Sequence, residues 1–330
     1  MFNLSLLLLF CIAVAAMNDP HPLSDEYIDL INSQQSLWKA GRNYPEDTPL
    51  EQLQGLLGTI MGGLREGYTT KTHDTDVIKT LPESFDPRDK WQNCPSLYEI
   101  RDQGICGSCW ALGAVGAMTD RWCIHSNGSQ FHFSAQDMTG CVKECNGCHG
   151  GTPEKAWSYW FTDGVVSGGN YNSKQGCRPY EMQNCIHDNS PAANCSNRGV
   201  AHCVDKCQDD YNVSYKVDKR FGLEAYHVQH EEHIKAELYL NGPLEAAFRA
   251  CPDLFHYKSG VYKSTIDFND VRCGGHSVKM LGWGIENGTK YWLLANSWDY
   301  NWGDGGYFKI IRGENHMHIE NEVIGGMPKF

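Results

Sequence analysis

The spacing of the cysteines sets the strongest limit on the architecture of this chain. The chain has 330 residues and 15 cysteines, and after Cys11 the next cysteine is Cys94. A region so dense in cysteine favours a framework of disulfide bonds, which forms in an oxidising compartment. The same region is rich in Trp and Gly and is long enough to bury a sizeable core. We therefore expect a disulfide-bonded globular domain over residues 81–330 and a different kind of segment before it.

The first residues of the chain fit that compartment. Residues 4–16 are apolar and end in small residues, but they are fewer than the roughly 18 to 20 that a helix needs to cross a bilayer. We expect a signal peptide over residues 1–16 that leads into the secretory pathway, to a lysosome or endosome or out of the cell. No later apolar run is long enough to span a membrane. Sequons of the type Asn-x-Ser/Thr, which are compatible with a glycoprotein, begin at Asn127, Asn194, Asn212 and Asn287.

Residues 17–80 contain no cysteine and form a distinct unit of the sequence. Ser24 and two acidic residues precede apolar residues at helical spacing, a pattern that predicts a capped helix near residues 25–31. Residues 50–57 predict a second helix, and the polar residues 68–79 predict an exposed linker. So short a segment, with few large apolar groups, would be marginal as an independent domain. We therefore expect an inhibitory propeptide, with a small independent N-terminal domain as the alternative.

In the cysteine-rich region, helical patterns come first and strand patterns later. Residues 109–126 are small and apolar with helical spacing, and residues 153–161 predict another helix. Strand-like runs separated by Gly and Asn turns follow over residues 244–249, 275–281, 290–295 and 306–311. This order predicts an α+β fold with two lobes.

The segment QGICGSCW, residues 103–110, is the most specific motif of the chain. It fits the pattern C-G-[SA]-C-[WY], in which the second cysteine, here Cys109, is the nucleophile of a peptidase. Cys109 lies where a Gly-rich loop enters an apolar helix, and the N-terminus of a helix stabilises a thiolate. Most other cysteines of a secreted protein pair in disulfides, but the motif favours a nucleophile at this position.

A thiolate nucleophile needs an imidazole partner, and the imidazole needs a group that orients it. His276 begins a strand-like run behind two glycines, and Asn296 follows another such run with Trp298 close by to exclude water. Residues in the order Cys, His, Asn match the arrangement of a cysteine peptidase. Their separations exceed the roughly 130 to 150 residues of the minimal pattern, so we expect inserted material between Cys109 and His276.

The sequence also bears on three other classes of protein. The net charge of −12 argues against a protein that binds nucleic acid through charge. A catalytically inactive homologue would lack one of the catalytic residues, and all are intact. A zinc-binding module is an alternative, because zinc-compatible spacing occurs at Cys141, Cys145, Cys148 and His149. An oxidising compartment favours disulfides between such cysteines instead.

The chain resembles the cathepsin B branch of the papain family of cysteine peptidases over essentially its whole length. The motif around Cys109 carries the resemblance, together with GCRPY at 176–180, YKSGVY at 257–262 and LGWG at 281–284. The resemblance implies a papain-like α+β fold with a helical left lobe, a β-barrel-like right lobe and an active-site cleft between them. It also implies a zymogen with polypeptide substrates, inhibited by its own propeptide and by proteins of the cystatin type, with no cofactor and no metal.

The resemblance also assigns roles in the cleft. Cys109 would be the nucleophile, His276 its partner, Asn296 the orienting residue and Gln103 a donor to the oxyanion. Gly150 and Gly151 would offer backbone hydrogen bonds, and a carboxylate at the bottom of the S2 pocket would accept Arg as well as hydrophobic side chains. The residues implied to bind substrate are Gly150, Gly151, Pro153, Ala247, Ser277, Glu322, Trp298 and His187.

The family pattern predicts an occluding loop at about residues 185–195 and a set of disulfides. A cysteine of the family pattern is missing, since Gly140 stands in its place, and Cys203, Cys251 and Cys273 are therefore left open. A Cys251–Cys273 bridge is one way to pair two of them. The implied bridges are Cys94–Cys123, Cys106–Cys148, Cys141–Cys145, Cys177–Cys207 and Cys185–Cys195.

The occluding loop departs from the family at one residue. Asp188 stands where the family has the second of two adjacent histidines, which bind the C-terminal carboxylate of a substrate. The first histidine is kept as His187, and its family partner is present as Asp102. A carboxylate at Asp188 would repel the carboxylate of the substrate. We therefore expect weak dipeptidyl carboxypeptidase activity and retained endopeptidase activity.

Overall fold

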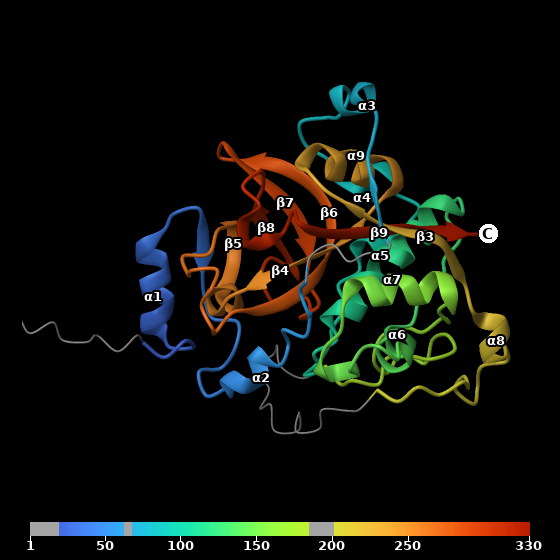
Figure 1. Cartoon of the computed structure of the whole chain (residues 1–330). Helices are drawn as coiled ribbons and strands as arrows, with labels where there is room; N and C mark the ends of the chain where they lie inside the picture. Colours follow the sequence, from blue (N-terminus) through green and yellow to red (C-terminus); the bar gives the residue numbers. More distant parts are fainter. Residues whose placement is uncertain (1–19, 63–67, 185–200) are drawn as a thin grey trace, which may run out of the picture.

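The computed structural model describes residues 20–62, 68–184 and 201–330. These residues form two lobes, one mainly helical and one mainly of strands (Figure 1), and the expected two-lobed α+β fold is confirmed. Across these three stretches, no helix combines the length and the apolar character that crossing a membrane requires.

The helical lobe is built around α5 (Cys109–His125), with α6 (Ala135–Cys141) and α7 (Pro153–Thr162) beside it (Figure 1). All residues of α5 from Cys109 to Cys123 are buried, which explains why its sequence has no polar face. Small residues let this helix approach the sheet: a Cβ on Gly113 would lie 3.1 Å from Glu245 Oε1. The two helices predicted in this lobe, α5 and α7, are both present.

A nine-stranded sheet forms the second lobe, and part of it packs against α5 and α7 of the helical lobe. In sheet order the strands are β1 (Trp38–Ala40), β5 (Tyr257–Tyr262), β8 (Tyr307–Ile311), β7 (Thr289–Ala295), β6 (Gly274–Glu286), β4 (Leu244–Ala250), β9 (Glu322–Lys329), β3 (Phe221–Val228) and β2 (Thr69–Lys71). Neighbouring strands are antiparallel except in the pairs β5 with β8 and β2 with β3, which are parallel. The four strands predicted from the sequence correspond to β4, β6, β7 and β8.

Residues before Leu81 supply both edge strands of this sheet, β1 and β2. The same segment contributes α1 (Asp25–Gln34), α2 (Leu50–Gln54) and α3 (Thr75–Lys79). The predicted cap of α1 is present, since Ser24 Oγ accepts a hydrogen bond of 3.2 Å from the N–H of Tyr27. The predicted linker over residues 68–79 is largely exposed, as expected, but it contains regular structure, since β2 pairs with β3 and α3 follows.

The remaining helices of the described residues are found in both lobes. They are α4 (Pro87–Lys90), α8 (Tyr215–Asp218) and α9 (Glu231–Asn241), with the 3₁₀ helices η1 (Pro95–Tyr98), η2 (Gly147–His149), η3 (Pro252–His256) and η4 (His316–His318). In Figure 1, α9 lies next to α4, away from α6 and α7.

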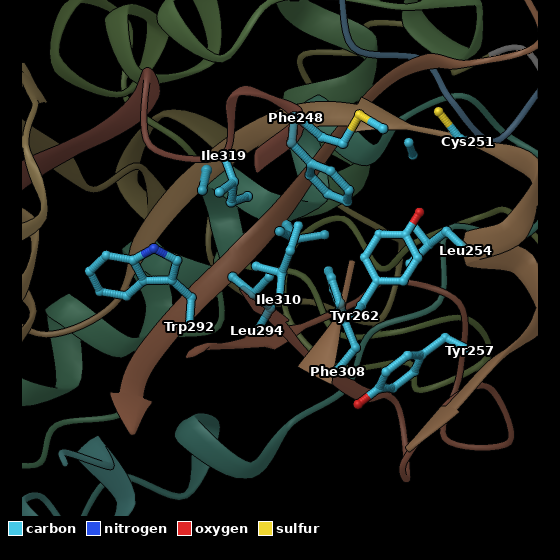
Figure 2. Packing of buried hydrophobic residues seen from close by; sticks show 14 of the residues in the cluster. Phe248, Cys251, Leu254, Tyr257, Tyr262, Trp292, Leu294, Phe308, Ile310 and Ile319 are labelled. Atoms are coloured by element: carbon cyan, nitrogen blue, oxygen red, sulfur yellow. The ribbon is translucent and has the colours of Figure 1, made fainter. Parts of the chain in front are cut away.

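The largest hydrophobic core fills the strand lobe. Figure 2 shows aromatic side chains of β4, β5, β7 and β8 packed together, among them Phe248, Tyr257, Trp292 and Phe308. Residues before Leu81 extend the same core, with Tyr27, Trp38 and Tyr44 all buried. Burying each large apolar side chain stabilises the fold by roughly 1.5–3 kcal/mol, so these residues bind the segment firmly to the lobe.

The structure contains disulfides that match part of the predicted set. The bridges Cys94–Cys123, Cys106–Cys148 and Cys177–Cys207 are present. Cys251–Cys273, which the sequence left open, is also formed. The predicted bridge Cys185–Cys195 lies outside the described residues.

The predicted Cys141–Cys145 bridge is wrong, because Cys141 is bonded to Cys203. A Cβ on Gly140 would lie 2.8 Å from the carbonyl oxygen of His202, so the glycine lets this backbone approach α6. The two bonded cysteines thereby come within 4.6 Å between their Cα atoms. The zinc alternative fails for the same reason, since Cys141 and Cys148 are both in disulfides.

Candidate active site

Cys109 is the first residue of α5, directly after the N-cap Ser108. The loop before it is held by the Cys106–Cys148 bridge and by a hydrogen bond of 2.9 Å from the N–H of Gly107 to the carbonyl of Cys148. The Cys109 side chain is buried. Its thiol therefore stands at the positive end of a helix, between the two lobes.

His276 and Asn296 reach the same place from neighbouring strands. His276 lies near the start of β6, and Asn296 follows β7, which pairs with β6. His276 Nε2 is 2.8 Å from Asn296 Oδ1. An amide oxygen can only accept, so Nε2 carries the proton, and Nδ1 has no hydrogen-bond partner within the described part of the chain. Nδ1 is thus left for proton transfer.

Aromatic rings enclose the imidazole. The rings of His276 and Trp298 lie 4.7 Å apart at 33°, and Phe248 meets His276 edge-on at 5.9 Å. Burial lowers the pKa of His276 to about 4, and the bond to Asn296 opposes that shift. The imidazole in this structure is therefore neutral over the physiological range of pH.

Gln103 is fully buried beside the cleft, and both polar atoms of its side chain form hydrogen bonds. Its Oε1 accepts a hydrogen bond of 2.7 Å from Ser297 Oγ, which directs the amide nitrogen the other way. Nε2 donates to the carbonyl of Cys106 at 2.7 Å and to that of Leu56 at 2.9 Å. Leu56 belongs to the segment before Leu81, so a peptide carbonyl of that segment lies on this donor.

The segment before Leu81 runs through the cleft and contacts both of its walls. The N–H of Gly151 donates to Gly58 at 3.0 Å, and the N–H of Ile60 donates to Gly151 at 2.8 Å. On the other wall, the N–H of Thr59 donates to Gly275 at 3.0 Å. The fit leaves no room for a side chain at Gly58, where a Cβ would lie 1.9 Å from the carbonyl oxygen of Gly107.

Thr59 covers the thiol. Its Oγ1 is 3.2 Å from Cys109 Sγ and donates to Ser277 Oγ at 2.9 Å. Burial raises the pKa of the Cys109 thiol, although the hydrogen bond with Thr59 and nearby backbone N–H groups oppose the shift. Desolvation disfavours both charged forms, so the thiol and the imidazole are neutral together beneath this segment.

Three of the residues predicted to bind substrate, Ala247, Ser277 and Glu322, form one row across three strands. Ala247 of β4 lies opposite Ser277 of β6 on one side and opposite Glu322 of β9 on the other. Glu322 is buried, and its Oε1 accepts a hydrogen bond of 3.2 Å from the N–H of Gly62. Pro153 begins α7 two residues after Gly151. Of the predicted substrate-binding residues, His187 lies outside the described part of the chain.

Three residues at this site were not predicted from the sequence. Gly58 and Thr59 lie in a Gly-rich stretch without periodicity, which carries no signal for a place in a cleft. Glu245 is fully buried on β4, where its Oε2 accepts a hydrogen bond of 2.8 Å from Trp157 Nε1. Burial raises the pKa of Glu245 well above its ordinary value. Its alternation with apolar neighbours on the strand gave no reason to bury it.

A thiol at a helix N-terminus, an imidazole held by an amide oxygen and a side-chain amide donor are the parts of a cysteine peptidase. Here they meet between a helical lobe and a sheet lobe. Comparison with known families agrees with that class. Residues 81–327 match the papain family cysteine protease model, and residues 23–63 match the peptidase family C1 propeptide model. The chain therefore belongs to the papain family of cysteine proteases, which are hydrolases.

Relatives within that family are similar over most of their length. Cathepsin B-like cysteine proteinase 4 of Caenorhabditis elegans is 43% identical over 323 residues, which cover 93% of this chain and 93% of that protein. Cathepsin B-like cysteine proteinase of Schistosoma japonicum is 40% identical over 325 residues, 93% of this chain and 92% of that protein. The solved structure of proCathepsin B S9 from Trypanosoma congolense has a TM-score of 0.81 at 35% identity and covers 94% of this chain and 100% of its own.

Proposed function

We propose that this chain is the zymogen of a cysteine endopeptidase in which Cys109 attacks the carbonyl carbon of a peptide bond. His276 protonates the leaving amine, a thioester to Cys109 remains, and water hydrolyses the thioester with His276 as base. Asn296 holds the imidazole throughout, since its Oδ1 is 2.8 Å from Nε2. Nδ1 of His276 carries the proton in each step.

Gln103 and the N–H of Cys109 stabilise the oxyanion in this mechanism. The support for Gln103 is that its Nε2 already donates to a peptide carbonyl, that of Leu56, at 2.9 Å. Removal of one such donor slows catalysis by roughly a hundred- to a thousandfold. Gln103→Ala should therefore retain a nucleophilic thiol while losing most peptide hydrolysis.

The observation that carries the proposal is the strand of the chain's own pro-segment seated over the thiol. Gly58, Thr59 and Ile60 use the backbone groups of Gly151 and Gly275 that an extended substrate would use. The Thr59 hydroxyl lies 3.2 Å from the Cys109 sulfur. Residues 17–80 thus act as an inhibitory propeptide, and their removal gives the active enzyme over residues 81–330.

Removal of the pro-segment also charges the catalytic pair. Burial under Thr59 raises the pKa of Cys109 and lowers that of His276 to about 4. When the segment leaves, water enters, the desolvation falls and the helix N-terminus favours a thiolate beside an imidazolium. The zymogen is therefore inactive for two reasons. The pro-segment fills the cleft, and Cys109 and His276 are both neutral.

The S2 pocket takes hydrophobic side chains or Arg at P2. Glu322 lies at the end of the row formed with Ala247 and Ser277, so its carboxylate can accept a charge-assisted hydrogen bond from an Arg guanidinium. Glu322→Gln should reduce cleavage of an Arg-Arg substrate by about tenfold or more, since such a bond contributes roughly 1.5–3 kcal/mol. A Phe-Arg substrate should lose little, and equal losses for both would contradict this pocket.

We also propose weak exopeptidase activity, inhibition by other proteins and a location in the secretory pathway. His187 and Asp188 lie outside the described residues, and the weak dipeptidyl carboxypeptidase activity rests on the charge of Asp188 alone. Proteins of the cystatin type would inhibit the open cleft. The disulfides support an oxidising compartment, in keeping with a signal peptide over residues 1–16 and a place in the lysosome, in the endosome or outside the cell.

The test of this function is Cys109→Ser in the full chain. After activation at acid pH by an added protease, the wild type should cleave peptides and be labelled by a thiol-directed epoxide. The variant should show neither, because its hydroxyl is far less acidic than a thiol. Peptide cleavage by the variant at the wild-type rate would contradict the proposal.

A further inference from the structure

Tyr180 ends the GCRPY motif, and no step of the proposed reaction uses it. Its side chain is buried in the core of the helical lobe, with 4% of its surface exposed. Its own N–H donates to the carbonyl of Gly169 at 2.9 Å, and the N–H of the next residue, Glu181, donates to Gln136 Oε1 at 3.1 Å. Hydrogen bonds of the neighbouring backbone and packing in the core thus hold the Tyr180 ring in place.

The hydroxyl of Tyr180 joins two segments of the active site. It donates a hydrogen bond of 3.1 Å to the backbone carbonyl of Gln103, and it lies 2.7 Å from Ser108 Oγ. The phenol has one proton, which it gives to the carbonyl, so the Ser108 hydroxyl donates to the phenol oxygen. A chain of two hydrogen bonds therefore runs from Ser108, the residue before Cys109, to Gln103.

Both ends of this chain carry a donor to the oxyanion. The Gln103 side chain comes from the loop before α5, and the N–H of Cys109 comes from the first turn of α5 itself. Two donors stabilise one oxygen only if the distance between them is held closely. From the strand lobe, Ser297 holds Gln103 in two ways. Ser297 Oγ donates to Gln103 Oε1 at 2.7 Å, and the backbone N–H of Gln103 donates to the carbonyl of Ser297 at 3.0 Å. Tyr180 supplies the corresponding contact from the helical lobe.

We propose that Tyr180 is a positioning residue of the oxyanion site, whose hydroxyl holds the Gln103 main chain against the N-terminus of α5. The inference rests on the proposed roles of Cys109 and Gln103. Tyr180 touches neither substrate nor the reacting atoms. Burial raises the pKa of its phenol far above the ordinary value, so the hydroxyl remains a donor at every pH at which the enzyme works.

The test compares two reactions of the same thiol in Tyr180→Phe, made as the full chain and activated like the wild type. Peptide hydrolysis passes through an oxyanion, whereas alkylation by iodoacetamide displaces iodide at carbon and forms none. We expect kcat for hydrolysis to fall by about tenfold, less than the loss of a donor itself, with KM almost unchanged. The alkylation rate per titrated active site should equal that of the wild type.

Tyr215→Phe is the matched control, because it removes another buried hydroxyl, one that donates to Asp137 Oδ1 at 2.6 Å and not to Gln103. It should leave kcat unchanged. In a Gln103→Ala background, Tyr180→Phe should cause no further loss, since it acts through Gln103.

Three outcomes would overturn the inference. They are an unchanged kcat in Tyr180→Phe, a parallel fall of hydrolysis and alkylation, and a full additional loss in the Gln103→Ala background. The parallel fall would assign Tyr180 to the fold alone. Failure of the proposed function would look different, since Cys109→Ser would then still hydrolyse peptides or iodoacetamide would leave Cys109 unlabelled.

Discussion

The two halves of the pro-segment bind the peptidase domain in opposite ways. The upstream half, residues 20–62, places Trp38 and Tyr44 in the main core and pairs β1 with β5 antiparallel. The downstream half, residues 68–80, pairs β2 with β3 in parallel. Thr69 and Thr70 of β2 are exposed, and α3 has no buried residue. We therefore expect the upstream half to supply most of the affinity for the peptidase domain and the downstream half to detach from it first.

Histidine side chains lie where the downstream half contacts the peptidase domain. His73 donates its N–H to His233 Nδ1 at 3.1 Å, and its Nε2 lies 2.9 Å from Glu237. The first contact requires a neutral His233, since a protonated ring has no acceptor. The His230 ring lies 6.4 Å from that of His233. Protonation of His233 therefore breaks one contact of the half that apolar burial does not hold.

The largest expected effect is on the upstream half. Trp38 is 5% exposed, stacks on Tyr257 at 6.1 Å and donates to the carbonyl of Lys263 at 3.0 Å. Trp38→Ala should destabilise the closed zymogen by about 3–5 kcal/mol, which corresponds to at least about a hundredfold more opening. The measurement is the alkylation rate of Cys109 in the full chain at pH 7, where opening exposes the thiol.

The enzyme activated from Trp38→Ala is its own control, since Trp38 is removed with the propeptide and the alkylation rate must then match the wild type. If the zymogen variant is alkylated no faster than the wild-type zymogen, the upstream half does not supply the affinity.

The second largest effect is expected at Gly58, where the pro-segment passes close to the backbone of Gly107. A Cβ on Gly58 would lie 1.9 Å from the backbone oxygen of Gly107, which cannot move aside easily. Overpacking of this kind costs about 1–3 kcal/mol, so Gly58→Ala should raise the alkylation rate of the zymogen by about five- to a hundredfold. Protection of the β1 amides against hydrogen exchange should persist. Unchanged alkylation would mean that the strand does not pass so close to Gly107.

The smallest effect is the dependence on pH of the downstream half. The pKa of His233 is lowered by burial and by the neighbouring His73 and His230, with Glu232 opposing. Docking is therefore fully favourable above the ordinary histidine pKa of about 6.5, and it weakens as pH falls below that value because the released form binds a proton more readily. Hydrogen exchange of residues 69–73, corrected for the intrinsic rate, should lose protection between pH 7 and 5.

In His233→Gln the loss of protection should be reduced, since a glutamine oxygen accepts the same hydrogen bond at every pH. The control is His316→Gln, because His316 Nε2 accepts a similar bond of 2.9 Å from the N–H of Ser264 inside the peptidase domain. A pH dependence of β2 that stays the same in His233→Gln would show that His233 does not cause it.

Local patterns predicted the parts of the molecule that depend on neighbouring residues. The motif around Cys109 predicted both the start of α5 and the nucleophile, because the glycines before it and the apolar run after it fix that junction. Ser24 predicted the cap of α1 in the same way. In contrast, α9 escaped prediction because its buried Ile234, Ala236 and Leu238 alternate as in a strand.

Features set by distant contacts were out of reach of the sequence. The three-residue strands β1 and β2 are too short for a pattern, and they form only because the edges of the sheet lie beside them. The Cys141–Cys203 bridge depends on the approach of His202 to Gly140. Thr59 lies over the thiol because the segments on either side of it are anchored, a fact that its own neighbours do not encode.

We infer that the pro-segment keeps Cys109 and His276 neutral and that its removal creates the ion pair. The direct measurement is the rate of Cys109 alkylation by iodoacetamide from pH 4 to 9, in the full-length zymogen and in the activated enzyme. Burial raises the pKa of the thiol and lowers that of His276 to about 4 in the zymogen. We expect rapid alkylation of the activated enzyme already near pH 5, and slow alkylation of the zymogen that rises only at alkaline pH. Superimposable profiles for the two forms would contradict it.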